Sequence, residues 1–284
     1  MLDVVVVNFN NWSQTAEYVN KINGFSCIDH IIIVDNHSTN NSFEKLELLC
    51  DDKVILIKTD KNGGYGYGNN FGVMHAISNY SPKYIAITNP DVSYTEDCII
   101  NCINFLNEHR DFALVAPTMK NPDGGICKCA WNLPHWYELA FGTLELLGRK
   151  VNINFLPFDE SIEFQTCDCV KGSMLVIRSE VFVDVEGYDA DIFLYSEENV
   201  LGFKFKSKNF KSAVLTTDFF IHERGTTISK VYKKVFSKKK LIVKSRLILL
   251  RKYYKIDFLK MLIVYISYSI SLFESFIIDV FKSK

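Results

Sequence analysis

The sequence lacks several features that would assign it to a class of protein at once. Basic and acidic residues nearly cancel, with a net charge of −1, so the chain lacks the positive excess of a bulk nucleic-acid binder, and we expect no nucleic-acid partner. It has no Gly-Lys-Ser or Gly-Lys-Thr motif, which excludes a Walker phosphate loop. The start, Met1-Leu2-Asp3, carries neither a basic stretch nor a cleavage site, and we expect a protein of the reducing cytosol.

Cysteine spacing argues against a structural zinc site. Two pairs among the eight cysteines, Cys127 with Cys129 and Cys167 with Cys169, are separated by a single residue. Structural zinc sites ordinarily place about two to four residues between paired cysteines. Side chains alternate along a strand, so each pair would share one face. We interpret the four as small core residues, with metal or redox use as the alternative.

The first part of the chain has the pattern of a β-α-β unit. With 284 residues, 48% of them hydrophobic, the chain can form one large domain, or one domain plus an appendage. Apolar runs at residues 3–10 and 31–39 each end in a polar turn, and Ser13 can cap a helix between them. Such units form parallel sheets, which places Asn8 and Asp35 at the same sheet edge.

A third apolar run carries a carboxylate to that edge. Residues Tyr84–Thr88 are typical of a strand buried on both faces, and Pro90 ends it. Asp91 therefore lies at the C-terminal edge of the sheet, where ligands of open α/β sheets bind and a carboxylate can hold a divalent cation against a phosphate. The alternative for Asn89-Pro90-Asp91 is an ordinary β-turn.

A glycine-rich loop precedes this strand. It runs from Asn62-Gly63-Gly64 to Gly72, between a strand expected at Val54–Ile57 and a helix. Glycines let backbone amides approach a ligand, and the helix N-terminus favours phosphate. The loop is therefore a candidate phosphate-binding element, with a flexible surface loop as the alternative.

Two acids and a histidine are further candidate site residues. Glu197 and Glu198 follow an apolar stretch, where burial raises carboxyl pKa values and suits a general base. A solvated helix start is the alternative for them. His222 ends a strand expected at Val214–Ile221, and histidine is a good metal ligand, although a lone histidine is more often structural.

The remaining pattern before the C-terminal region is less specific. A helix is expected over Cys98–Leu106, and strands over Ala113–Ala116 and Cys169–Arg178. The segment Leu201–Phe205 could be helix or strand. The aromatic-rich segment Trp131–Pro157 has weak periodicity, and we expect it to form loops that cover the crevice.

The last part of the chain differs in composition. Lysines crowd its start, at positions 230, 233, 234, 238, 239 and 240. Ten apolar residues between Leu259 and Phe281 then recur at helical spacing, with Lys260, Ser267, Ser271 and Glu274 opposite. The longest uncharged run, Met261–Phe273, is too short to span a bilayer. We expect an amphipathic helix on a membrane or a partner, with packing on its own domain as the alternative.

These motifs, in this order, resemble the family 2 glycosyltransferases. They are Asp35, the glycine-asparagine loop, Asn89-Pro90-Asp91, Glu197-Glu198 and His222. The chain looks most like the rhamnosyltransferase-like members that build bacterial surface polysaccharides. The resemblance covers about residues 3–228, and its most specific parts are residues 5–11, 34–39 and 62–70.

The resemblance implies an α/β GT-A fold, a Rossmann-like, mostly parallel sheet flanked by helices, over residues 1–228. A basic, amphipathic helical extension follows over 229–284. The resemblance also implies a nucleotide-sugar donor, Mg²⁺ or Mn²⁺ held by Asp91 and His222, and inversion by a base, Glu198, with Glu197 as the competitor. Asp35 would accept a hydrogen bond from the pyrimidine. The other implied nucleotide-binding residues are Asn8, Asn10, Asn62, Gly64, Asn69 and Asn89.

Three positions depart from the family pattern. Asn89 replaces the first acid of an Asp-x-Asp metal motif, although its carbonyl can still bind a hard cation. Val200 stands where a second acid often follows the base. Lysine, Lys204 or Lys206, stands where the family tends to have arginine.

The activity implied is a metal-dependent, inverting hexosyl or rhamnosyl transfer (EC 2.4). The donor would be a UDP- or dTDP-sugar, and the acceptor a hydroxyl of a glycan or lipid-linked oligosaccharide in O-antigen or capsule synthesis. The basic tail would hold the protein peripherally on the cytoplasmic face of the inner membrane. One alternative is a non-catalytic nucleotide- or glycan-binding protein. A sugar nucleotidyltransferase is less favoured, because Asn8-Phe9-Asn10-Asn11 stands where that class has a glycine-rich basic loop.

Overall fold

The computed structural model describes residues 1–144, 155–223 and 234–282. A nine-stranded sheet is built from β1 (Leu2–Asn8), β2 (His30–Asp35), β3 (Val54–Lys58), β4 (Tyr84–Thr88), β5 (Val92–Ser93), β6 (Phe112–Lys120), β8 (Phe164–Cys167), β10 (Met174–Arg178) and β11 (Lys211–His222). The short strands β7 (Ala130–Trp131) and β9 (Cys169–Val170) pair separately. The helices are α1 (Trp12–Ile22), α2 (Ser42–Glu47), α3 (Tyr65–Tyr80), α4 (Glu96–Glu108), α5 (Trp136–Phe141), α6 (Ser179–Asp184), α7 (Glu197–Ser207), α9 (Val235–Ile248), the π-helical turn η1 (Leu249–Tyr253) and α10 (Phe258–Lys282).

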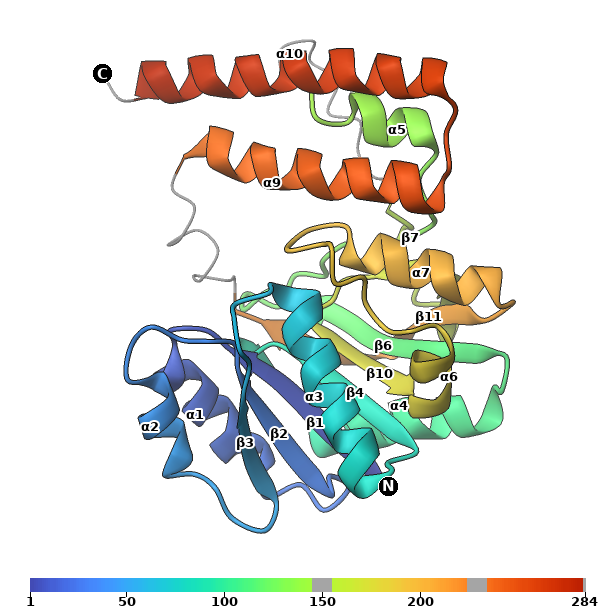
Figure 1. The fold of residues 1–284 in the computed structure, drawn as a ribbon. Helices are drawn as coiled ribbons and strands as arrows, with labels where there is room; N and C mark the ends of the chain where they lie inside the picture. Colours follow the sequence, from blue (N-terminus) through green and yellow to red (C-terminus); the bar gives the residue numbers. More distant parts are fainter. Residues whose placement is uncertain (145–154, 224–233, 283–284) are drawn as a thin grey trace.

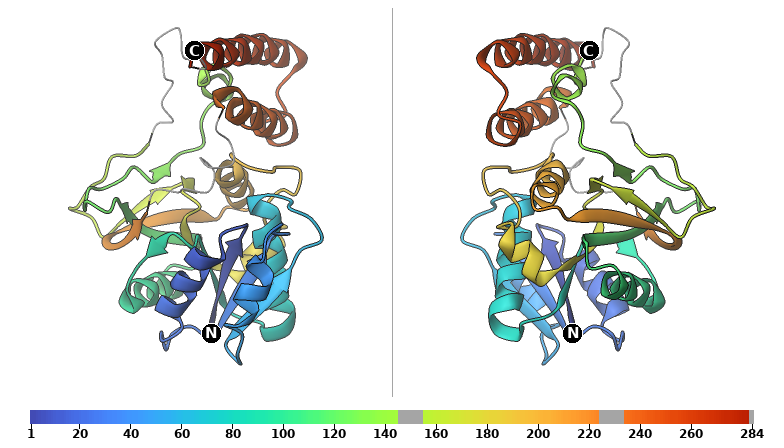
Figure 2. Two further views of the ribbon diagram at one scale, coloured as in Figure 1. Left: turned by 90° about the vertical axis from the view of Figure 1, so that its left-hand side faces the viewer. Right: turned by 90° about the vertical axis from the view of Figure 1, so that its right-hand side faces the viewer.

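The main sheet has the expected mostly parallel α/β arrangement (Figure 1). Its strand order is β3-β2-β1-β4-β10-β6-β11-β5, and β8 pairs with β11. Strand β1 runs parallel to both β2 and β4, whereas β10 is antiparallel to both of its neighbours. Helices α3 and α6 cover one face, and α1 and α4 cover the other (Figure 2).

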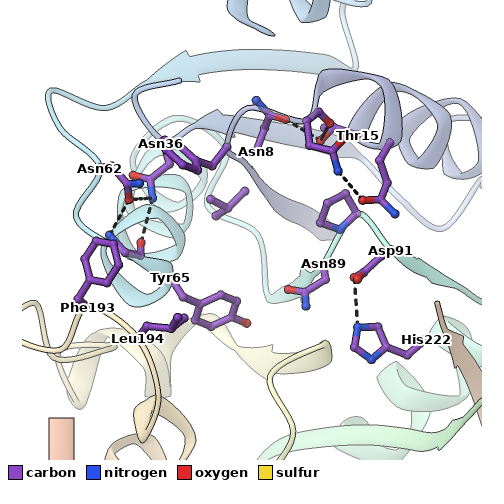
Figure 3. A pocket seen from close by; sticks show the side chains of 16 residues that line it. Asn8, Thr15, Asn36, Asn62, Tyr65, Asn89, Asp91, Phe193, Leu194 and His222 are labelled. Carbon is purple, nitrogen blue, oxygen red and sulfur yellow. Dashed lines mark hydrogen bonds and ion pairs between the residues drawn. The ribbon is translucent and has the colours of Figure 1, made fainter. Parts of the chain in front are cut away.

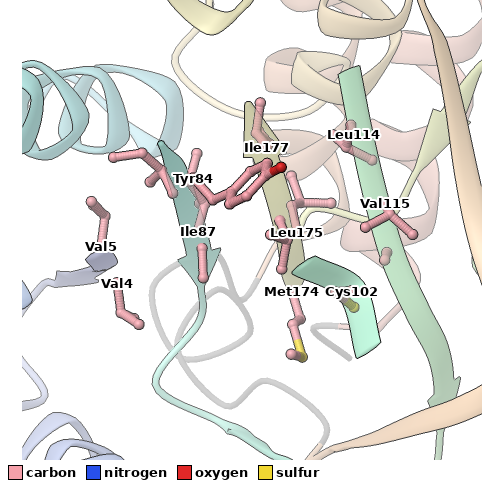
Figure 4. Packing of buried hydrophobic residues seen from close by; sticks show 14 of the residues in the cluster. Val4, Val5, Tyr84, Ile87, Cys102, Leu114, Val115, Met174, Leu175 and Ile177 are labelled. Atoms are coloured by element: carbon pink, nitrogen blue, oxygen red, sulfur yellow. The ribbon is translucent and has the colours of Figure 1, made fainter. Parts of the chain in front are cut away.

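The apolar runs of the sequence form the centre of this sheet. Every residue of β4 and nearly every residue of β1 and β2 is buried, because helices lie on both faces. The side chains of Val4, Ile87, Leu175 and Val115 come from four different strands and share one core (Figure 4). The register pairs Asn8 with Asp35, so the two polar strand ends expected at one edge do meet there.

Several local expectations are corrected. Helix α1 begins at Trp12 after Asn11, so Ser13 lies in its first turn and does not cap it. The single strand expected over Cys169–Arg178 is split, because residues 171–173 leave the strand path: the Lys171 amide bonds to the Cys129 carbonyl, 2.8 Å away. Neither cysteine pair shares one strand, contrary to the expectation, because Cys127 and Cys129 lie outside strands and Cys167 and Cys169 lie in β8 and β9. Cys129, Cys167 and Cys169 are buried as expected, whereas Cys127 is half-buried.

The aromatic-rich segment also differs from the expectation. Its described part contains β7 and α5, and α5 packs against the C-terminal helices, not over the crevice. Two hydrogen bonds fix it there, from Ser267 Oγ to the Ala140 carbonyl (2.7 Å) and from Tyr268 to the Leu139 carbonyl (3.0 Å). The open choice at Leu201–Phe205 is resolved as helix α7.

The C-terminal region forms a helical layer outside the sheet (Figures 1 and 2). The boundary expected after residue 228 lies outside the described residues, as do Lys230 and Lys233. Helix α10 is amphipathic, as expected, but its 24-residue apolar stretch, Phe258–Phe281, is long and apolar enough to cross a membrane by length and composition. The expectation of a segment too short to span was wrong, because it counted only the uncharged run, and a helix continues through isolated charges.

Candidate functional site

A cavity of about 270 Å³ opens at the C-terminal edge of β1 and β4 (Figure 3). We call it the central cavity. Six of the predicted site residues line it: Asn8, Asn62, Gly64, Asn89, Asp91 and His222. Five others, Asn10, Asp35, Asn69, Glu197 and Glu198, are not among its lining residues. The sheet edge identified from the sequence is therefore the site of a cavity.

Asn8 connects the cavity to Asp35. The Asn8 amide nitrogen donates to Asp35 Oδ2 (3.0 Å) and to Ser38 Oγ (3.2 Å), and its oxygen accepts from Thr15 Oγ1 (3.0 Å). Asp35 is fully buried, and its other oxygen accepts from the Ser38 amide (2.8 Å). The carboxylate thus fixes the loop after β2 behind Asn8, and a role for it in base recognition stays a prediction.

An asparagine pair holds the glycine-rich loop. Asn36 donates to Asn62 Oδ1 (3.2 Å) and to the Gly64 carbonyl (3.0 Å), and Asn62 Oδ1 also accepts from the Gly64 amide (3.1 Å). Asn36 and Asn62 both line the cavity. The loop is therefore ordered by side-chain amides, and the alternative of a flexible surface loop is not what the structure has.

Gly64 is required where it stands. Its φ is +92°, and a Cβ atom there would lie 1.9 Å from the Phe193 carbonyl oxygen. The next amide, of Tyr65, donates to that same oxygen (3.1 Å) and begins α3. A glycine thus lets the loop before α3 meet the segment before α7, and Phe193 and Leu194 close this side of the cavity.

Asp91 and His222 are brought together by strand pairing. The end of β11 pairs antiparallel with β5, with His222 opposite Val92, and the Glu223 amide donates to the Asp91 carbonyl (2.9 Å). His222 Nε2 lies 3.2 Å from Asp91 Oδ1 (Figure 3). Both atoms are buried and have no ordinary hydrogen-bond partner.

This pair fits a divalent cation. Two ligands of one cation at bond lengths of about 2.1 Å lie about 3 Å apart, as these two atoms do. No group of three or more histidine, cysteine or acidic side chains is arranged to hold a metal among the residues that the structure describes. Asp91 and His222 would thus supply two ligands, with Asn89 beside them in the cavity wall, and leave the remaining positions to phosphate oxygens and water.

Glu197 and Glu198 start helix α7 after two residues in the left-handed region, Tyr195 and Ser196, each with φ of 71°. Glu197 is buried, and its Oε1 has no hydrogen-bond partner. Glu198 is half-buried, and its Oε1 accepts from the Gly172 amide (3.3 Å). Burial raises the pKa of both carboxyl groups, and the Glu198 charge adds to the rise in the pKa of Glu197. The solvated helix start is therefore excluded for Glu197.

Tyr65 links Glu198 to the cavity. Tyr65 lines the cavity, and its hydroxyl donates to the Gly172 carbonyl (2.5 Å). A Cβ on Gly172 would lie 3.0 Å from the Tyr65 hydroxyl and 3.5 Å from Glu198 Oε1. The carboxylate thus lies just beyond the cavity wall that Tyr65 forms. Glu198 itself lines a separate, smaller cavity with Tyr188 and Gly202, and its role as general base stays a prediction.

Two predicted residues have structural surroundings. Asn10 is exposed and joins the loop after β2 through Thr39, whose amide donates to Asn10 Oδ1 (2.8 Å). Asn69 is buried within α3, where its amide nitrogen donates to the Tyr65 carbonyl (3.0 Å) and its Oδ1 has no partner. Their assignment to nucleotide binding stays a prediction.

Sequence reasoning missed part of the cavity wall. Asn36, Tyr65, Thr15 and the Phe193–Leu194 pair line it and were not singled out. Asn36 directly follows Asp35 at a strand end, which is a signal that could have been used. Nothing in the local pattern of Phe193–Leu194 indicates the cavity, because its position depends on the approach of Gly64.

Comparison with curated proteins finds bacterial rhamnosyltransferases. Rhamnosyltransferase WbbL of Escherichia coli (strain K12) is 25% identical over 144 residues, 48% of this chain and 51% of that protein. The N-acetylglucosaminyl-diphospho-decaprenol L-rhamnosyltransferase of Mycobacterium tuberculosis (strain ATCC 25618 / H37Rv) is 21% identical over 209 residues, 69% of this chain and 66% of that protein. The chain thus spans about half to two thirds of the length of these relatives.

Solved structures with a similar fold are glycosyltransferases. The mannosyltransferase PcManGT from Pyrobaculum calidifontis, in complex with GDP-Man and Mn²⁺, has a TM-score of 0.61 at 13% identity and covers 95% of this chain and 69% of that chain. GalNAc-T7 with UDP, GalNAc and Mn²⁺ has a TM-score of 0.59 at 15% identity, covering 78% and 44%. At these identities the similarity shows the fold, which is the GT-A fold.

The family itself is shown by sequence. The sequence model of glycosyl transferase family 2 matches residues 3–176, more than half of the chain. That range contains the Asn8–Asp35 edge, the glycine-rich loop and Asp91, which the structure gathers around the central cavity. The chain therefore belongs to glycosyl transferase family 2.

Proposed function

We propose that this protein transfers a sugar from a nucleotide-sugar donor to a hydroxyl of a surface-polysaccharide acceptor, with inversion at the anomeric carbon. The observation that carries the proposal is the Asp91–His222 pair, 3.2 Å apart, in the wall of a cavity that five asparagines also line, together with aromatic and apolar side chains. A nucleoside diphosphate needs this combination: amide groups for the nucleotide and a cation site for the diphosphate.

The donor lies in the central cavity. Asn8, Asn36 and Asn62 offer neutral donors and acceptors to the nucleoside, and the Gly63–Gly64 turn brings the backbone near it at the start of α3. Asp91 and His222 would hold Mg²⁺ or Mn²⁺ against the diphosphate. The bound cation would offset the charge that grows on the diphosphate as the glycosidic bond breaks, so no general acid is needed there.

Glu198 is the general base. It is the acid that Gly172 and Tyr65 connect to the cavity wall, and its partial exposure gives an acceptor access to it. The raised pKa suits proton removal from a hydroxyl near neutral pH. Glu197 is buried beside it, and its ionisation is opposed by burial and by the charge of Glu198. Attack by the deprotonated hydroxyl on the face of the sugar opposite the diphosphate would invert the anomeric centre.

The names of the curated relatives support a donor sugar and an acceptor. The curated relatives are named as rhamnosyltransferases, one of them acting on an N-acetylglucosaminyl-diphospho-decaprenol. We therefore assign rhamnosyl or another hexosyl transfer from a UDP- or dTDP-sugar to a glycan or lipid-linked oligosaccharide of the O-antigen or capsule type. The protein would work on the cytoplasmic face of the inner membrane, bound peripherally through residues 229–284.

A non-catalytic nucleotide-binding protein is the second candidate. Asn89 in place of an acid removes one charge from the metal motif, and it lines the cavity next to Asp91. Such a protein would bind nucleoside diphosphates with metal but release no nucleotide from an activated sugar.

The test is a panel of UDP-, dTDP- and GDP-sugars incubated with the purified protein and Mn²⁺. Slow release of the nucleoside diphosphate without acceptor is expected from one or a few donors. That release should stop on addition of EDTA, return with excess Mn²⁺, and be absent in Asp91→Asn. Binding of nucleotide with no release from any donor, even when acceptor glycolipids are supplied, would favour the non-catalytic candidate.

A further inference from the structure

Helix α10 has its polar and apolar sides reversed relative to an ordinary surface helix. Its polar side chains Ser267, Ser271, Glu274 and Ser275 are buried. Ser267 Oγ donates to the Ala140 carbonyl of α5 (2.7 Å), and Ser271 Oγ donates to the Thr143 carbonyl (2.6 Å). The polar stripe of the helix therefore faces the protein, where carbonyl groups satisfy it.

The opposite side of α10 is apolar and exposed. Eleven of its large hydrophobic side chains are exposed, among them Phe258 (80%), Ile266 (56%), Phe273 (64%) and Phe281 (73%). Elsewhere in the described chain only ten large hydrophobic side chains are exposed, and they are spread over many elements. A continuous apolar face of this kind marks an interaction surface, whereas single exposed hydrophobic residues need no explanation.

This face looks away from the catalytic sheet. Helix α9 lies between α10 and α7, so α10 is the outermost layer of the molecule in all three views (Figures 1 and 2). The layer is also strongly basic, since residues 234–282 contain eleven basic and three acidic residues. Lys238, Lys240, Lys244, Arg251 and Lys255 are exposed on it.

The three acids of the layer offset only part of this charge. Glu274 is buried, and the Asp279 carboxylate accepts from the amides of Val235 and Phe236 at the start of α9 (2.9 Å each). Asp257 pairs with Lys260 (2.6 Å). Arg251 lies over the Tyr265 ring of α10, 5.5 Å from its centroid. An exposed apolar face on a basic helical layer is complementary to an anionic lipid surface, since each exposed cation near such a surface adds to binding.

We propose that the outward face of α10 inserts into an anionic lipid bilayer with the helix lying in the plane of the membrane. This insertion specifies which face of the C-terminal region contacts lipid in the peripheral location proposed above. It does not depend on whether the protein transfers a sugar. The bonds of Ser267, Ser271 and Asp279 fix α10 to α5 and α9, and a helix crossing the bilayer would expose this polar stripe to lipid. Pairing with a second copy would bring two basic layers together.

The first test is flotation of the full-length protein with vesicles. Binding is expected to vesicles of equal parts phosphatidylcholine and phosphatidylglycerol, and to be weaker with phosphatidylcholine alone. The triple variant Ile266→Gln, Ile270→Gln, Phe273→Gln should lower the vesicle partition coefficient by at least about tenfold, because it removes three apolar side chains from one face. The control variant Leu48→Gln, Met74→Gln changes exposed hydrophobic residues on other elements and should bind like the wild type.

Two further measurements distinguish in-plane insertion from a membrane-crossing helix and from pairing with a second copy. Phe273→Trp preserves the apolar surface and should be quenched by lipids brominated near the headgroup more than by lipids brominated at the chain ends; the reverse order would indicate a crossing helix and overturn the in-plane arrangement. Analytical ultracentrifugation without lipid should give a monomer for both the wild type and the triple variant. A wild-type dimer that the triple variant abolishes, without vesicle binding by either protein, would assign the face to a second copy.

Discussion

Ser245 on α9 donates a hydrogen bond of 2.7 Å to the backbone carbonyl of Leu194, and Leu194 lines the central cavity. The same loop is held by Asp189, whose carboxylate accepts from the Tyr253 hydroxyl (2.6 Å) and pairs with Lys252 (2.8 Å). The outer helical layer is thus bonded directly to one wall of the site. Substitutions in that layer should therefore change the affinity of the site for the donor nucleotide.

Ser245→Ala tests this connection. It leaves the Leu194 carbonyl without its partner in a partly buried setting, which costs about 1 kcal/mol, and we expect the dissociation constant of the donor nucleotide to rise by about fivefold. Ser275→Ala is the matched control, because Ser275 is equally buried but bonds only to Leu272 of its own helix. Equal nucleotide affinity in the two variants, measured by calorimetry, would show that the layer does not support the site.

Glu198→Gln should lower kcat by about 10² to 10⁴, the usual contribution of a general base, and leave donor affinity nearly unchanged. Glu197→Gln is the comparison, since it alters the neighbouring buried acid. We expect that variant to keep most of its turnover. A large loss of kcat in Glu197→Gln with little effect of Glu198→Gln would transfer the role of base to Glu197.

The pH profile should report the raised pKa of Glu198. Burial raises this pKa, so the carboxylate is protonated, and kcat falls, at a higher pH than for an exposed glutamate of pKa about 4.3. The charge of Lys171 opposes the rise. Lys171→Gln should therefore shift the acid limb of kcat to higher pH, while Lys128→Gln should not; a shift to lower pH in Lys171→Gln would contradict the assignment.

Gly64→Ala should destabilise the protein and weaken nucleotide binding together. The new Cβ would overlap the Phe193 carbonyl, and the positive φ disfavours alanine, so we expect a loss of about 2 kcal/mol or more in the free energy of unfolding. Gly24→Ala is the control, because no atom lies within 4 Å of a Cβ there. Chemical denaturation of both variants makes the comparison, and equal stability would mean that the loop relaxes freely.

The parts of the site that lie at the ends of successive parallel strands could be predicted from the sequence. Asn8 and Asp35 end neighbouring strands of one β-α-β unit, so the chirality and parallel pairing of such units place them together. The position of Asp91 at this sheet edge followed from the same reasoning applied to β4. The apolar runs gave the buried strands for the same reason, since strands covered on both faces are continuously hydrophobic.

The rest depends on contacts between distant segments. His222 meets Asp91 only because β11 continues far enough to pair with the two-residue strand β5, which no local pattern indicates. The burial of the polar side of α10 likewise depends on carbonyl groups in and just after α5, a helix that the weak periodicity of its segment did not predict. The split between β9 and β10 results from a bond to Cys129 in another loop.

The most direct measurement is calorimetric binding of UDP, dTDP and GDP with and without Mn²⁺, on the wild type and on Asp91→Ala. We predict that at least one nucleotide binds the wild type, that its affinity falls by about tenfold or more without Mn²⁺, and that Asp91→Ala abolishes the effect of the metal. Equal affinity with and without Mn²⁺, or no binding of any nucleoside diphosphate, would contradict a cation-assisted nucleotide-sugar site between Asp91 and His222.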